Sequence, residues 1–200
     1  MIGNLRRAEL EVGKACRVAM DLAGPKIRTG PIKAKFDAVR LVPNDRLLLT
    51  NPQIVGRPAK VDREGQVRAI ARIGCSMPEV FQDVAVGENV LFDDGKISAT
   101  VEEASSEHMV LVINRAKAKG QKLREGKGIN FPNTNLNLPA LTEKDLNDLP
   151  FVAKHADIVN YSFVRRPADI VQLQTELERL GRSDLGIVLK IENPQSFVNL

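Results

Sequence analysis

The sequence has no tryptophan, one tyrosine and seven phenylalanines among its 200 residues. Proteins that hold single-stranded nucleic acid stack its bases on aromatic side chains, so this small supply argues against nucleic acid as a partner. Cysteine is almost as scarce, with only Cys16 and Cys75 present. Two cysteines do not form a disulfide framework, and their scarcity is typical of a reducing compartment, so we expect a cytoplasmic protein.

Long hydrophobic runs are also missing. The longest aliphatic stretch is residues 109–113, whereas a membrane-spanning helix needs about 20 apolar residues. Residues 1–7 are polar and basic, and no apolar segment follows them, so the pattern of a secretory signal is absent. We therefore expect no membrane association.

The charge is moderately basic, with 29 lysines and arginines against 25 acidic residues and a formal net charge of +4. Such a balance suits nucleic acid, a membrane surface or anionic metabolites about equally. Because aromatic residues are so few, phosphorylated small molecules are the preferred ligand class.

Three zones follow one another along the chain. Residues 1–30 contain one apolar segment, residues 17–22, which predicts a buried strand ending in an Ala-Gly-Pro turn. Residues 31–137 hold short runs of Val, Ile, Leu and Thr separated by turn residues, which predicts a small β-barrel or sandwich. Within this zone, Asp94 and Gly95 between two apolar runs predict a hairpin.

From residue 138 the hydrophobic period changes to that of helices alternating with strands. Thr142 is an N-cap candidate, although Pro150 predicts that its helix is short or broken. Strands are expected over residues 157–164 and 186–192, and between them a helix from Pro167 to Leu180, closed by Gly181. Strand, helix and strand at these lengths predict a parallel βαβ unit.

The expected fold is therefore α/β with an inserted all-β domain. Residues 1–30 and 138–200 form the α/β part, and residues 31–137 form the insertion. A (β/α)₈ barrel takes about 250 residues, so the three convincing parallel strands make at most a partial TIM barrel.

Charged residues interrupt two of the predicted buried strands near their ends. Lys190 and Glu192 are two positions apart, so they point to the same face of a strand, and Asp21 ends the first strand. Ligands bind at the carboxyl ends of strands in parallel α/β folds, and buried charges need a partner, ligand or metal. A structural salt bridge at the strand end is an equally good interpretation of the Lys190–Glu192 pair.

Basic residues also gather in two loops. Arg28 follows the first strand, and a planar guanidinium suits bidentate contact with phosphate. Residues 115–127 carry six basic residues against the single acid Glu125. Such a run is most often a solvated face, but the glycines at 120, 126 and 128 would let the backbone approach a phosphate.

Five segments resemble, in the same order, segments of the pyruvate kinase family. The Asp-Leu-Ala-Gly-Pro-Lys-Ile-Arg-Thr-Gly stretch is similar to the passage from that family's barrel into its inserted β-domain. The Asp-Asp-Gly turn is similar to a hairpin of the β-domain, and the later segments resemble the return into the barrel and the next two strand ends. The five segments are residues 20–30, 90–97, 126–132 together with 138–145, 162–165 and 190–193.

This resemblance implies a transferase that moves a phosphoryl group between phosphoenolpyruvate and ADP, giving pyruvate and ATP in glycolysis. By the family's pattern, Lys190 would stabilise charge on the transferring group and Glu192 would bind Mg²⁺ or Mn²⁺. Asp21 and the backbone carbonyl of Leu22 would help to hold K⁺.

The same resemblance implies that Arg28 and Lys127 contact the nucleotide and that the inserted domain closes as a lid. Asp94 and Ser162 are further site candidates, without an assigned role. The resemblance also implies that the full-length parent is a homotetramer. A cationic side chain that stabilises the transferring phosphoryl group, as expected of Lys190, increases the reaction rate by roughly 10³–10⁵-fold.

The sequence departs from the family pattern in ways that bear on activity. The Arg-x-Asn-Phe-Ser-His-Gly strand, with its substrate-binding Arg and further K⁺ ligands, is absent and would lie before Met1. The second metal carboxylate would lie beyond Leu200, and residues 194–197 replace a usual Glu-Gly pair. Leu22 and Ala23 stand where Thr-Lys is common. We therefore expect a divergent parent, and no activity from these 200 residues alone.

Three other functions remain open at this point. The parent could be a metal-dependent lyase of phosphoenolpyruvate-like substrates, because such enzymes also place carboxylates at barrel strand ends. It could be a non-catalytic relative that binds nucleotides or sugar phosphates. A basic β-module that binds nucleic acid is the third, against which the scarce aromatics argue.

Overall fold

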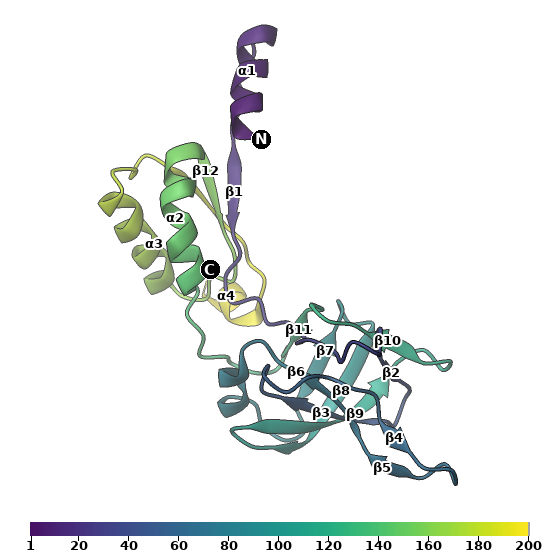
Figure 1. The fold of residues 1–200 in the computed structure, drawn as a ribbon. Helices are drawn as coiled ribbons and strands as arrows, with labels where there is room; N and C mark the ends of the chain where they lie inside the picture. The colour runs from purple at the N-terminus through teal and green to yellow at the C-terminus, as the bar shows by residue number, and fades with distance from the viewer. Residues whose placement is uncertain (200) are drawn as a thin grey trace. The chain divides into compact units, whose positions relative to one another are not determined.

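The structure is a computed structural model that describes residues 1–199 (Figure 1). The chain divides into two compact units. Two separate stretches, Met1–Pro25 and Pro139–Leu200, make one unit, which we call the α/β unit. The stretch between them, Lys26–Leu138, makes the other, which we call the β unit. The passage from one unit to the next lies at residues 25–26 and 138–139.

The α/β unit is built on a three-stranded parallel sheet in the order β1-β12-β13. Its strands are β1 (Ala19–Leu22), β12 (Ile158–Tyr161) and β13 (Gly186–Leu189). The register aligns Asp21 with Asn160 and Asn160 with Val188. The predicted parallel βαβ unit is thus confirmed.

Two helices pack on one face of this sheet, α2 (Glu143–His155) and α3 (Pro167–Arg179) (Figure 1). Leu149 and Val152 of α2 and Leu173 and Leu177 of α3 form one apolar cluster with strand residues. The strand residues in this cluster include Leu22, Val159 and Tyr161. Since neighbouring strand residues point to opposite faces, Asp21 and Asn160 point away from the helices.

Helix starts and stops follow the expected chemistry, with one exception. The Thr142 side chain accepts a hydrogen bond from the Asp145 amide in a capping box, and Gly181 follows α3 with φ +69°. The prediction of a short or broken helix at Pro150 is wrong, because α2 runs through it from Glu143 to His155. Pro150 is exposed, so water can hydrate the carbonyl that loses its amide partner.

One further helix was not expected from the sequence, α1 (Ile2–Val12), which precedes β1 (Figure 1). No residue of α1 is buried, and its first turn has neither a side-chain cap nor an acidic residue to mark the helix start. Glu9 joins it to the following loop by accepting from the Cys16 amide at 2.5 Å. The short α4 (Pro194–Val198) follows β13, and the Asn193 side chain caps it by accepting from the Ser196 amide.

The β unit contains a six-stranded mixed sheet in the order β11-β7-β8-β9-β3-β6, and all its neighbouring strands are antiparallel except β3 and β6. Two strand pairs complete it, β10 with β2 and β4 with β5. Their bounds are β2 (Val39–Leu41), β3 (Arg46–Thr50), β4 (Lys60–Val61), β5 (Val67–Ala69), β6 (Ala71–Gly74), β7 (Asn89–Phe92), β8 (Ile97–Ala104), β9 (His108–Arg115), β10 (Gln121–Leu123) and β11 (Ile129–Asn130). The 3₁₀ helix η1 (Pro78–Gln82) follows β6.

Most of the predicted strands are present, and the hairpin at Asp94 is confirmed. β7 and β8 pair antiparallel with Phe92 opposite Ile97, and the turn residues Asp93, Asp94 and Gly95 all have positive φ. The strands β5 and β6 are separated only by Ile70, yet they belong to different sheets. β2, β4, β10 and β11 have two or three residues each, too few to show a hydrophobic period.

None of the helices within residues 1–199 is both long and apolar enough to cross a membrane.

Candidate functional site

The predicted lysine and glutamate meet at the carboxyl ends of β12 and β13. The Lys190 amide donates to the Tyr161 carbonyl at 2.9 Å, which extends the ladder one residue beyond β13. Lys190 Nζ lies 3.3 Å from Glu192 Oε1 and donates to Ser162 Oγ at 3.1 Å. Both residues therefore lie on one side of the sheet's end, as expected, although they follow β13 rather than belonging to it.

Glu192 has a second partner that the sequence did not indicate. Its Oε2 accepts from the backbone amide of Phe163 at 3.3 Å. Phe163 has φ +57°, a left-handed conformation that is uncommon for a residue with a β-carbon. No spacing or composition signal identifies such a residue, because its role depends on the direction of its amide.

Asp21 lies on the same face as this cluster. Its Oδ1 accepts from Asn160 Nδ2 at 2.7 Å, between directly paired residues of β1 and β12. Asn160 and Ser162 are two positions apart, so they share a face, and the polar groups of β1 and of the β13 end are joined by β12. Asp21 is exposed, whereas Leu22 points into the helix-covered core with 1% exposure.

A second group of predicted residues lies in the β unit. Arg28 pairs with Gly128 in an isolated antiparallel bridge, and its Nη1 donates to the Gly126 carbonyl at 2.5 Å. Lys127 Nζ lies 3.1 Å from Asp93 Oδ1. The fold therefore brings the loop of Arg28 next to the loop of Lys127, which is 99 positions later in the sequence.

The first aspartate of the Asp-Asp-Gly turn, rather than the second, makes the ion pairs of this group. Asp93 is buried, and its oxygens contact Lys96 Nζ at 3.0 Å and Lys127 Nζ at 3.1 Å. The hydrogen bond from Lys96, followed by that from Lys127, lowers the pKa of Asp93 although burial acts against this. Asp94 is exposed at the tip of the turn.

Comparison with known proteins decides the family. The family model described as pyruvate kinase, barrel domain, matches residues 1–200. The chain belongs to the pyruvate kinase family. The resemblance found in the five sequence segments is therefore confirmed.

Curated relatives agree with this assignment. The chain is 30% identical over 200 residues to a pyruvate kinase of Bacillus licheniformis, covering 100% of the chain and 32% of that protein. It is 31% identical over 203 residues to a pyruvate kinase of Geobacillus stearothermophilus, covering 100% of the chain and 31% of that protein. A pyruvate kinase of Mycobacterium tuberculosis (strain CDC 1551 / Oshkosh) is 30% identical over 197 residues, covering 98% of the chain and 38% of that protein. The chain thus spans about a third of the length of these relatives.

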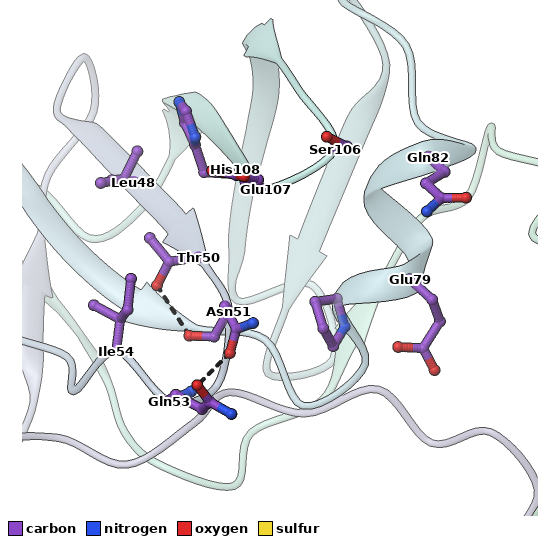
Figure 2. A pocket seen from close by; sticks show the side chains of 11 residues that line it. Leu48, Thr50, Asn51, Gln53, Ile54, Glu79, Gln82, Ser106, Glu107 and His108 are labelled. Atoms are coloured by element: carbon purple, nitrogen blue, oxygen red, sulfur yellow. Dashed lines mark hydrogen bonds between the residues drawn. The ribbon is translucent and has the colours of Figure 1, made fainter.

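The strand-end cluster of this pyruvate kinase family member does not border either of the two cavities described next. One cavity, of about 610 Å³, lies in the β unit between the end of β3, η1 and the β8–β9 turn (Figure 2). Its wall carries the carboxylates of Glu79 and Glu107 together with His108, and neither lysine nor arginine. A wall that carries two carboxylates and no lysine or arginine does not suit an anionic substrate.

The other cavity, of about 450 Å³, lies in the α/β unit at the opposite end of the sheet from Lys190. It is lined by residues at the amino ends of β12 and β13, including Asp157 and Gly186, and by the paired Arg182 and Asp184. Both arginine and aspartate line it, so it has no clear preference for an anion or a cation.

Glu192 and Asp21, the two carboxylates expected to bind metal ions, can each offer an oxygen to a metal, but in the described part of the chain they do not belong to a larger cluster of ligands. Within residues 1–199, no group of three or more His, Cys, Asp or Glu side chains is placed to hold a metal ion. Glu192 has 33% side-chain exposure, and each carboxylate oxygen has two lone pairs, so its contacts with Lys190 and Phe163 leave room for a metal. The same holds for Asp21, whose Oδ1 already accepts from Asn160.

Proposed function

We propose that this chain carries part of the active site of a pyruvate kinase, which transfers a phosphoryl group between phosphoenolpyruvate and ADP to give pyruvate and ATP. The observation that carries the proposal is the position of the Lys190 ammonium group. It is held by Ser162 Oγ at 3.1 Å and by Glu192 at 3.3 Å, at the carboxyl ends of two parallel strands. Active sites of parallel α/β barrels lie at this end.

Lys190 acts by electrostatic stabilisation. A phosphoryl group in transfer spreads negative charge over its oxygens, so the main contribution of the protein is a cation fixed in the right place. The side chain of Lys190 is 37% exposed, which leaves the ammonium accessible to substrate while two protein oxygens orient it. Its ion pair with Glu192 is therefore compatible with catalysis as well as with a structural role.

Glu192 would bind Mg²⁺ or Mn²⁺, and Asp21 with the backbone carbonyl of Leu22 would help to bind K⁺. Such ions, when bound, neutralise the charge of the phosphate oxygens and orient them. Glu192 and Asp21 supply hard carboxylate oxygens, which these cations prefer. Their existing partners, Phe163 and Asn160, fix the direction of each carboxylate.

Arg28 and Lys127 would contact the nucleotide in the β unit, with Asp94 as a further candidate at the turn tip. The two basic residues lie on adjacent loops, and Asp93 orients Lys127. We assign the α/β unit to a (β/α)₈ barrel, and residues 31–137 of the β unit to its inserted lid domain. By the same reasoning the full-length protein is a cytoplasmic homotetramer, and these 200 residues alone are inactive.

The test is Lys190→Met in the full-length protein, with turnover followed by a coupled assay of pyruvate formation and ADP binding by calorimetry. We expect kcat to fall by roughly 10³–10⁵, equivalent to about 4–7 kcal/mol, while ADP affinity is unchanged. The control is Lys144→Met, because Lys144 is a largely exposed lysine of the same unit whose ion pair within residues 1–199 is with Asp148. It should leave turnover unchanged.

Near-normal turnover of Lys190→Met would remove Lys190 from the catalytic role. Unmodified protein that binds ADP but forms no pyruvate would instead support a non-catalytic member of the family.

A further inference from the structure

The turns that follow β1 and β12 are packed against each other. Gly24 has φ +65°, and Phe163, in the turn after β12, has φ +57°. A β-carbon on Gly24 would lie 3.0 Å from Phe163 Cδ2 and 3.1 Å from the Ser162 carbonyl oxygen. A β-carbon at these separations would force its neighbours to shift, so the ring of Phe163 packs closely against the Gly24 backbone.

Asp145 fixes the Gly24 turn from within the core. Its carboxylate is 1% exposed and accepts from the Ala23 amide at 2.9 Å and from the Gly24 amide at 3.2 Å. It also accepts from the amide of Thr142 at 3.0 Å and from the Thr142 hydroxyl at 2.6 Å. The bonds to Thr142 are those of a helix cap, but the bonds to Ala23 and Gly24 cross to a loop more than 120 positions away.

Among the described residues, Asp169 caps the other helix, α3, without hydrogen bonds to a distant loop. It occupies the same position in α3 as Asp145 does in α2, and it is 5% exposed. Its oxygens accept from the amides of Arg165 and Arg166, at 2.9 and 3.2 Å. These residues belong to the loop that leads directly into α3, so the bonds of Asp169 stay within its own helix start.

A continuous set of contacts therefore runs from Asp145 to the proposed catalytic pair. Asp145 holds Gly24, Gly24 receives the Phe163 ring, and the Phe163 amide donates to Glu192. The turn that Asp145 holds begins directly after Asp21 and Leu22. The distance between that segment and Lys190 thus depends on how firmly the two turns are packed.

We propose that Asp145 is a positioning residue of the phosphoryl-transfer site. Its buried carboxylate sets the Ala23–Gly24 turn against Phe163 and so fixes Asp21 and Leu22 relative to Lys190 and Glu192. Hydrogen bonds to a buried carboxylate are among the stronger ones in proteins, which makes this tie firm. The inference rests on the proposed function, since it assigns to Asp145 the support of that same site.

The first experiment compares Asp145→Asn with Asp169→Asn in the 200-residue chain by amide hydrogen exchange. Asparagine keeps the shape but replaces one acceptor oxygen with an NH₂ donor, which faces amide donors and loses their bonds. We expect faster exchange of the Ala23 and Gly24 amides in Asp145→Asn only. Asp169→Asn should affect the Arg165 and Arg166 amides instead, and thermal midpoints measured alongside correct for general destabilisation.

The second experiment measures turnover of the same two variants in the full-length protein. A displacement of about 1 Å at an active site can cost about 10²-fold in rate, so we expect kcat to fall by about that factor in Asp145→Asn. The KM for ADP should not change, because Arg28 and Lys127 belong to the other unit. Asp169→Asn should retain kcat.

Gly24→Ala provides an independent variant that changes no charge. Its β-carbon would collide with Phe163 and the Ser162 carbonyl at an unfavourable positive φ, so kcat should fall as in Asp145→Asn. If Asp145→Asn does not fold, this variant decides the question.

The outcomes separate this inference from the proposed function. Full-length protein without turnover would overturn the function, and the exchange experiment would then decide the role of Asp145 in holding the turn. Active protein in which Asp145→Asn and Gly24→Ala match Asp169→Asn, in both exchange and kcat, would overturn the inference.

Discussion

The two units differ in how completely they bury their apolar residues. In the β unit, residues from four strands of the large sheet, Leu47, Ile73, Ile97 and Ile113, are 0% exposed. In the α/β unit, the helices cover one face of the sheet, and Val188 and Leu189 of β13 remain 47% and 37% exposed. The proposed catalytic residues lie in the second unit, at the sheet end and on the face that the helices leave open.

Tight packing and the proposed chemistry are therefore concentrated in different parts of the chain. Burial of apolar side chains is the main source of stability, and it is most complete in the β unit. Charged groups that must meet substrate cannot be enclosed without a large desolvation cost, so Lys190 and Glu192 stay about one-third exposed.

We expect the two cores to unfold separately. Leu111→Ala in the β unit core should lower the stability of that unit by about 2–5 kcal/mol, because Leu111 is 0% exposed. The only tyrosine, Tyr161, lies in the other core, so its fluorescence reports unfolding of the α/β unit alone. We expect Leu111→Ala to reduce hydrogen-exchange protection within residues 26–138. The denaturant midpoint of the unfolding transition followed by Tyr161 fluorescence should not change.

The matched variant is Leu173→Ala, a 0% exposed leucine of the α/β core. It should shift the tyrosine transition to lower denaturant and leave the protection of residues 26–138 intact. If both variants shift both signals equally, the two cores unfold as one.

A smaller effect should come from Tyr161→Phe. Tyr161 is 0% exposed, and its hydroxyl has no hydrogen-bond partner within residues 1–199. Burial raises the pKa of this hydroxyl, and the charges of Asp169 and Asp145 add to the rise, so it stays neutral. An unpaired buried polar group costs about 1–3 kcal/mol, so its removal should stabilise the unit by about 1 kcal/mol.

The measurement is urea denaturation followed by helical circular dichroism, because the described α-helices all belong to the α/β unit. A loss of stability in Tyr161→Phe would show that the hydroxyl is bonded, for instance to a buried water molecule.

The smallest effect concerns acid stability of the β unit. Lys96 first, and then Lys127, lowers the pKa of Asp93, so its carboxylate stabilises the fold above the unfolded-state pKa of about 4. That stabilisation is lost as pH falls through the lower folded-state value. Asp93→Asn should therefore lower the thermal midpoint of the β unit at neutral pH and flatten its decline in acid.

Asp94→Asn is the control, since Asp94 is exposed in the same turn and its substitution should leave the pH profile unchanged. Parallel acid profiles for Asp93→Asn and the unmodified chain would contradict the role given to Asp93.

Local sequence signals predicted those elements whose causes are local. Turn residues and hydrophobic period gave β7, β8 and the hairpin between them, and capping chemistry gave the start of α2 at Thr142. The spacing of Lys190 and Glu192 predicted that both side chains lie on the same side of the strand end. Helix α1 was missed because its start has no side-chain cap and no acidic residue in the first turn.

The site residues that were missed depend on distant contacts. Phe163 acts through the direction of its backbone amide. Asp93 and Asp94 are the same residue type, so the sequence does not indicate which of them is buried. Asp145 looks like an ordinary capping residue until the fold brings Gly24 to it.

The family, the α/β and all-β composition of the two parts, and the charged residues at strand ends could all be predicted from the amino-acid sequence. Residue types, spacing and motif order suffice for these, because each depends on neighbours along the chain. Only the tertiary structure decided which side chains hold these residues in place, such as Ser162 for Lys190 and Asp145 for Gly24. These contacts join segments far apart in sequence, and only packing of the sheet and its helices brings their atoms within hydrogen-bonding distance.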